Sequence, residues 1–187
     1  MTTNFTPGGF LCKMPDHLLT LMQSTSFELE KNAFPCLIGT EDYPGEGYRQ
    51  WKIQVPPREL SGKKQETDFN ILDVKGFEPV MDFFGEFVNS IFRFRMSLLA
   101  PNVEIKNDSP HKFPRIHIPL SDTDSTFYIE HENIVKSIKL EYGNAYMINV
   151  IYFHGVKIDD NLEQRRNAFF SFDRFKDIEL NKKFNIN

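Results

Sequence analysis

Apolar residues recur at helical spacing in the first half of the chain and at strand spacing in the second half. The segment from Pro15 to Lys31 places three leucines and Met22 on one face, and Asp16 can cap its start, so we expect a helix there. Residues 78–92 have a wider apolar face built largely from phenylalanine and valine. This pattern predicts a second helix that packs against a sheet.

Short strand-like runs dominate from residue 93 onward, and turn signals such as Gly143-Asn144 separate several of them. One earlier strand is expected where Trp51, Ile53 and Val55 alternate with polar residues. The later strands are expected at 93–99, 115–120, 126–131, 134–140, 145–151 and 168–172. Helices followed by many short strands predict the α+β class, with a closed or sandwiched β unit.

The chain length of 187 residues favours a single domain over residues 1–187. Within it we expect a helical and loop-rich part over 1–92, a β core over 93–175 and a C-terminal tail over 176–187. The glycine- and proline-rich stretch 39–47 and the polar stretch 58–70 are expected to be loops.

The composition of the chain argues against several classes of function. The formal net charge is −4 and no basic stripe occurs, so nucleic-acid binding has no electrostatic support. The two cysteines, Cys12 and Cys36, lack metal-site spacing and fit a reducing, cytoplasmic compartment. No apolar run reaches the ~20 residues that span a bilayer, and no signal peptide is expected.

Two cationic or donor groups point to one face of a predicted strand. Arg115 and His117 alternate with apolar residues, so both side chains would enter the interior together. A buried charge needs a partner, and a dicarboxylate such as 2-oxoglutarate would supply one. The alternative is an internal carboxylate, such as that of Asp173.

Two further residues are candidates for chemistry. His154 follows a strongly apolar strand, where it could ligate a metal or simply be a core histidine. Arg166 enters the last strand, and its planar guanidinium matches a carboxylate bidentately. The alternative for the arginine pair is a surface position, and this applies more to Arg165 than to Arg166.

Together these residues form a pattern that covers about residues 93–173. The pattern consists of Arg-x-His-Ile-Pro-Leu at 115–120, Gly-x-x-Tyr-x-x-Asn at 143–149, the distal His154 and Arg166. It resembles the aspartyl/asparaginyl β-hydroxylase-like Fe(II)/2-oxoglutarate oxygenases, which include proline cis-hydroxylases and small phage-encoded members. The resemblance implies a double-stranded β-helix, a cupin or jelly-roll-like barrel, with N-terminal helices packed on it.

The same resemblance implies roles for the residues. His154 would be the distal iron ligand, Arg166 would hold the far carboxylate of 2-oxoglutarate, and Arg115 and His117 would contact this co-substrate. An active member would use Fe(II) and 2-oxoglutarate to hydroxylate a C–H bond of an amino acid or a peptide.

The chain departs from the family where the first metal ligands belong. A His-x-Asp should precede Arg115 by about nine residues, and Lys106-Asn107-Asp108 stands there instead. Lysine is protonated near neutral pH and ligates iron poorly, whereas Asp108 could keep the carboxylate role. His111 lies late for the missing position, and His131 belongs to a different predicted strand.

Three hypotheses follow from these residues. The chain is an active hydroxylase with an unusual metal-ligand set, acting on a small-molecule or peptidyl substrate in the cytoplasm. Alternatively, it is a catalytically inactive oxygenase-fold module with protein partners, for example a structural component of a phage virion. The third hypothesis is a binder of 2-oxoglutarate or a similar acid without turnover, which would need no iron.

Overall fold

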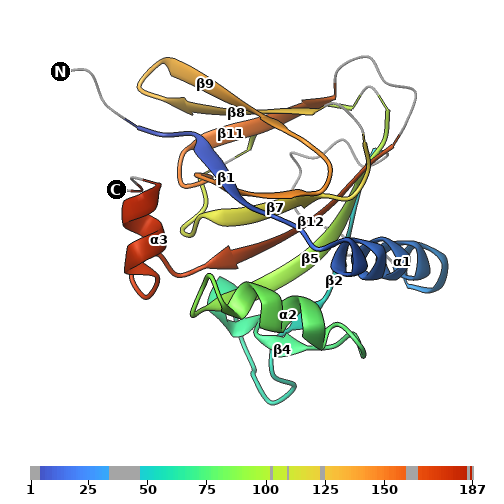
Figure 1. Ribbon diagram of the computed structural model, residues 1–187. Helices are drawn as coiled ribbons and strands as arrows, with labels where there is room; N and C mark the ends of the chain where they lie inside the picture. Colours follow the sequence, from blue (N-terminus) through green and yellow to red (C-terminus); the bar gives the residue numbers. More distant parts are fainter. Residues whose placement is uncertain are drawn as a thin grey trace.

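Two facing antiparallel sheets and three helices make up the computed structural model, which describes residues 5–33, 47–101, 103–108, 110–122, 125–158, 164–184 and 186 (Figure 1). The six-stranded sheet runs, from edge to edge, β1 (Gly8–Lys13), β10 (Asn144–Ile148), β7 (Arg115–Pro119), β12 (Arg165–Phe172), β5 (Ile91–Leu99) and β2 (Tyr48–Lys52). The four-stranded sheet runs β6 (Ile105–Asp108), β11 (Phe153–Ile158), β8 (Ser125–His131) and β9 (Ile134–Leu140). A short ribbon pairs β3 (Gln54–Val55) with β4 (Ile71–Leu72).

The helices α1 (Asp16–Asn32) and α2 (Glu78–Gly85) cover one face of the six-stranded sheet, and the four-stranded sheet covers the other (Figure 1). A third helix, α3 (Ile178–Lys183), follows the last strand. Because both faces of β12 are covered, all eight of its residues are buried. No helix in the described part of the chain is long and apolar enough to cross a membrane.

The two faces of the six-stranded sheet differ in chemistry. On the helix side, alternate β12 residues belong to the larger apolar cluster together with side chains of α1 and α2; these β12 residues are Ala168, Phe170 and Phe172. The opposite face meets a smaller apolar cluster that includes Phe127, Ile129 and Tyr146. That face also holds most of the buried polar side chains, so the polar chemistry lies between the two sheets.

The second predicted helix is shorter than its sequence pattern indicates. We expected a helix over residues 78–92, whereas α2 ends at Gly85 and β5 begins at Ile91. The cause is a contact distant in sequence: the buried carboxylate of Asp177 accepts hydrogen bonds from Asn89 N (2.5 Å), Asn89 Nδ2 (3.0 Å) and Ser90 Oγ (2.7 Å). These bonds fix a turn where the apolar periodicity alone would continue the helix.

The observed molecule is mostly β, with the three helices stated above, and the α+β expectation is broadly consistent with it. Strands were expected at the positions of β5, β7, β8, β9, β10 and β12, but β1, β6 and β11 were not anticipated. Since β1 and β2 both join the six-stranded sheet, the expected division at residue 92 does not follow the sheet. Within the described ranges the two sheets remain separate and do not close into a barrel. Cys36 and most of the loop expected at 39–47 lie outside the described residues.

Candidate functional site

A cluster of buried polar side chains occupies the face of the six-stranded sheet that is turned toward the four-stranded sheet. The strands β7 and β12 pair so that His117 lies opposite Phe169 and Arg115 lies opposite Ser171. Strand alternation therefore directs one set of side chains from both strands into the space between the sheets. The polar members of this inner cluster are Arg115, His117, Arg165, Asn167 and Ser171, all buried.

Arg165 is a buried cation. Its guanidinium Nε donates a hydrogen bond to Ser125 Oγ (2.8 Å), while its Nη2 is buried and has no hydrogen-bond partner. Among the residues that the structure describes, no carboxylate lies within ion-pair distance of Arg165. Burial lowers the pKa of Arg165 to about 10, so the side chain is still charged at neutral pH. A charge in this position requires an anionic partner or costs free energy.

His117 contributes a second buried donor. Asn167 Nδ2 donates a hydrogen bond to His117 Nδ1 (3.1 Å), so the imidazole proton resides on Nε2, which is buried without a partner. Burial, followed by the charges of Arg165 and Arg115, holds the pKa of His117 well below its usual 6.5. The ring is therefore neutral at physiological pH and donates through Nε2.

Arg115 has a carboxylate partner that the sequence did not indicate. Glu66 lies in the 3₁₀ turn Glu66–Asp68, and its Oε1 is 3.9 Å from Arg115 Nη2 and 2.9 Å from Arg93 Nη1. Glu66 also accepts a 2.6 Å hydrogen bond from Ser171. Burial alone would raise the pKa of Glu66, but the guanidiniums of Arg115 and Arg93 outweigh it and lower this pKa. Glu66 is thus an internal counter-ion of Arg115, where the sequence suggested Asp173.

The structure does not bring Arg166 into this inner cluster. Because β12 alternates, Arg166 points to the helix side of the sheet, where it forms an ion pair with Glu30 of α1 and a 3.4 Å hydrogen bond with Ser26 Oγ. Its guanidinium carbon also lies 4.1 Å from the centre of the Phe27 ring. The arginine that lies between the sheets is the preceding residue, Arg165. The sequence favoured Arg166 for this position, which corresponds to an error of one residue in the register of the strand.

His154, on β11, faces the same interior and is 3% exposed. Its Nδ1 donates a hydrogen bond to the backbone carbonyl of Tyr152 (3.0 Å), and this contact orients the imidazole ring. The next residue must be glycine, since a Cβ on Gly155 would lie 2.2 Å from the Tyr128 ring and 2.4 Å from the Ile105 carbonyl oxygen. The tight approach of β6, β11 and β8 therefore holds His154 in place.

Asp108, the other expected metal-site residue, and His111, which the sequence placed too late for this role, both lie close to His154 in the fold. The backbone register of β6 and β11 places Asp108 opposite His154. The ring of His111 lies beside that of His154, with 5.2 Å between the ring centres. Within the part of the chain that the structure describes, no group of three or more His, Cys, Asp or Glu side chains is arranged to hold a metal.

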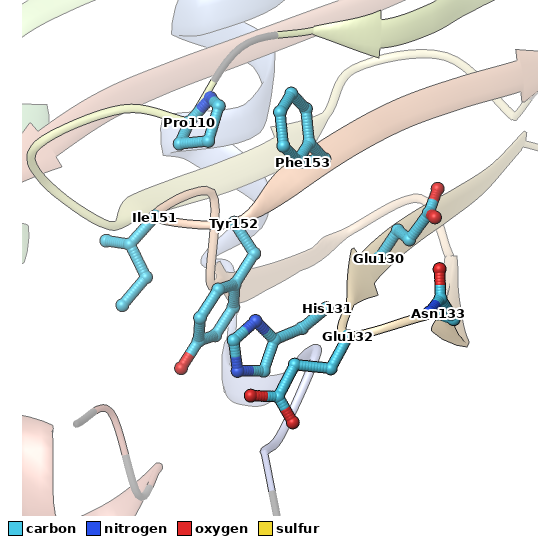
Figure 2. Close-up of a pocket in the computed structure, with 8 residues that line it drawn as sticks. All are labelled: Pro110, Glu130, His131, Glu132, Asn133, Ile151, Tyr152 and Phe153. Atoms are coloured by element: carbon cyan, nitrogen blue, oxygen red, sulfur yellow. The ribbon is translucent and has the colours of Figure 1, made fainter. Parts of the chain in front are cut away.

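His131 lies apart, in a pocket of about 330 Å³ beside the turn between β8 and β9 (Figure 2). The turn residues Glu132 and Asn133 have φ values of 49° and 64°, as a two-residue hairpin requires. The His131 ring stacks on Tyr152 with 4.1 Å between ring centres, and Phe5 packs edge-on against both. His131 is thus part of an aromatic stack at the rim of the four-stranded sheet.

Comparison with solved structures identifies the fold. The chain is similar to an oxidoreductase of the 2OG-Fe(II) oxygenase family from Burkholderia pseudomallei, with a TM-score of 0.60, 11% identity, and coverage of 86% of this chain and 80% of that one. It is also similar to a prolyl-4-hydroxylase from Pseudomonas putida, with a TM-score of 0.56, 9% identity, and coverage of 90% and 94%. A third similar structure is the α-ketoglutarate-dependent epimerase SnoN of nogalamycin biosynthesis, with a TM-score of 0.59 and 7% identity. The match covers 90% of this chain and 78% of that one.

These similarities show a shared fold at very low sequence identity. No family model and no curated protein matches the sequence. The fold is therefore that of 2-oxoglutarate-dependent oxygenases, and the function must be argued from the side chains between the sheets.

The neutral state of His117 predicts a specific loss of stability in acid. The folded protein holds the pKa of His117 below its unfolded value of 6.5, so the unfolded chain binds more protons below pH 6.5, and stability falls as pH decreases from there. The titration of His117 alone should lower the free energy of unfolding by up to about 1.4 kcal/mol for each pH unit below 6.5. Glu66, whose pKa is lowered from 4.5, adds its own loss only at lower pH.

Chemical denaturation at pH 7.5 and pH 5.5 measures this effect. His117→Gln should flatten the dependence between these two values, whereas His17→Gln, at an exposed position of α1, should leave it unchanged. An equal pH dependence in wild type and His117→Gln would mean that His117 is not held neutral in the fold.

Proposed function

We propose that this protein is a 2-oxoglutarate oxygenase-like protein that binds 2-oxoglutarate, or a closely similar dicarboxylate, between its two sheets. The observation that carries this proposal is a pair of buried donors without acceptors, Arg165 Nη2 and His117 Nε2, on the same sheet face. Each buried donor without a partner costs about 1–3 kcal/mol, and an anionic ligand would remove that cost. The shared oxygenase fold and the sequence pattern around Arg115 and His117 support the same ligand class.

Each residue then has a distinct part in binding. Arg165, oriented by Ser125, would bind one carboxylate bidentately in a water-poor environment, where such a pair is strong. His117, oriented by Asn167, would donate one hydrogen bond as a neutral ring. Arg115 shares its charge with Glu66, and we propose that it contributes electrostatic attraction more than a dedicated ion pair.

We further propose that an Fe(II) ion binds on one side of this site. His154 is buried, and its Nδ1–H bond to a backbone carbonyl is the usual outer contact of a metal-binding histidine. We propose His154 and Asp108 as ligands, since the strand pairing sets their backbones opposite each other. Bound Fe(II) would supply the oxidative chemistry that attacks a C–H bond of an amino-acid or peptidyl substrate, as expected for an aspartyl/asparaginyl β-hydroxylase-like protein with a double-stranded β-helix core.

A titration without oxygen tests the proposal. Calorimetry with 2-oxoglutarate, in the presence and absence of Mn(II), should show one binding site per chain. The monocarboxylate 2-oxobutyrate, which lacks the far carboxylate, should bind at least ~30-fold more weakly, corresponding to about 2 kcal/mol for a lost buried charge pair. Equal affinity for the two acids, or binding of neither, would contradict the proposal.

A binder of the acid without turnover is the second candidate, and Lys106 favours it. Lysine stands where the oxygenase pattern places a metal-binding histidine, so a chain that keeps the anion site could have lost the iron. The two candidates differ in one product: only the oxygenase would convert bound 2-oxoglutarate to succinate when Fe(II) and oxygen are supplied.

A further inference from the structure

We infer that His111 replaces the missing histidine and forms, with His154, a two-imidazole metal site. This inference rests on the proposed function and specifies its metal ligands. Its basis is the 5.2 Å separation between the two ring centres, with the ring planes at 51° to each other. Two imidazoles that bind one divalent ion through a ring nitrogen, at about 2.1 Å and with an angle of 90–110°, have centres about 4.6–5.4 Å apart.

The chain path explains how a histidine so late in the sequence reaches the site. Strand β6 ends at Asp108, opposite His154, and His111 follows three positions later. The backbone N–H of His111 donates to the carbonyl of Val150 (2.8 Å), just after the end of β10 and four residues before His154. The two histidines therefore approach from chain segments that are hydrogen-bonded to each other.

This arrangement changes the order of ligands along the chain. The oxygenase pattern has a histidine two residues before the aspartate, and Lys106 occupies that position here. A histidine three residues after the aspartate would supply the second imidazole instead, and imidazole with carboxylate is the ligand chemistry of non-haem Fe(II) sites. The remaining coordination positions would stay open for the co-substrate.

Metal binding by single variants tests the inference directly. Titration with Co(II), followed by visible absorption and calorimetry, should show one site in the wild-type protein. His111→Gln and His154→Gln should each weaken Co(II) binding at least ~100-fold, because even loss of an outer contact to a ligand costs 10–100-fold. The matched control His17→Gln, at an exposed position of α1, should bind Co(II) like the wild type.

A second measurement on the wild-type protein tests the inference even if one of the histidine variants does not fold. In nitrogen-15 spectra of the histidine rings, Zn(II) should shift one ring nitrogen of His111 and Nε2 of His154, and leave His17 unchanged. If His111→Gln keeps wild-type affinity while His154→Gln loses it, His111 is not a ligand, although a metal site and the proposed function survive. If the wild type binds no metal, the inference fails, and the titration with 2-oxoglutarate in the absence of metal still decides the anion site.

Discussion

Replacing Arg165 by methionine should weaken binding of 2-oxoglutarate by ~30-fold or more without unfolding the protein. Truncation of one partner in a buried charge pair costs about 2–5 kcal/mol of binding free energy. The protein without ligand should lose no stability, because a well-packed apolar side chain of similar length in place of a buried charge is often neutral or stabilising. Calorimetry and a thermal melt of the same sample measure both effects.

The adjacent residue provides the matched control. Arg166→Met removes an ion pair with Glu30 on the other side of the sheet, so this variant should lose about 1 kcal/mol of stability and keep wild-type affinity for 2-oxoglutarate. If Arg166→Met abolishes binding and Arg165→Met does not, the anion site lies outside the space between the sheets.

The same pair of arginines shows how far sequence reasoning reaches in a β protein. The alternation of polar and apolar residues correctly placed Arg115 and His117 on one face of one strand. In β12 all residues are buried, so polarity no longer marks which face points inward. The choice between Arg165 and Arg166 then depended on register, and a shift of one residue exchanges the two faces.

Contacts between distant segments account for what the sequence could not indicate. Glu66 lies in a polar stretch that resembles an ordinary surface loop, yet the fold brings it to Arg93, Arg115 and Ser171. Its partners are between 27 and 105 positions away in the sequence, and no local pattern records such a distance. The proximity of His111 to His154 is of the same kind, because it depends on how the segment after β6 returns toward the end of β10.

Phe170→Ala should be the most destabilising of the single changes considered, with a loss of about 3–5 kcal/mol in the free energy of unfolding. The side chain is fully buried on the helix face of β12. Its ring stacks on Phe94 (5.1 Å between ring centres) and meets the edge of Phe84 from α2 (4.9 Å). Removing the ring leaves a cavity where the helix layer joins the sheet. Urea denaturation measures the change, and a loss below about 1 kcal/mol would mean that the helix layer is not firmly packed.

The neighbouring Phe169 separates stability from binding in the same strand. Its ring stacks on His117 (5.2 Å between ring centres) and lies 5.3 Å from the Arg115 guanidinium carbon, so it supports the proposed anion site directly. Phe169→Leu should therefore weaken 2-oxoglutarate binding, whereas Phe170→Leu should reduce stability and leave the affinity of the folded protein unchanged. Because β12 contributes to both layers, its adjacent residues divide the two tasks. Arg165 and Phe169 face the proposed ligand site, whereas Arg166 and Phe170 pack against the helices.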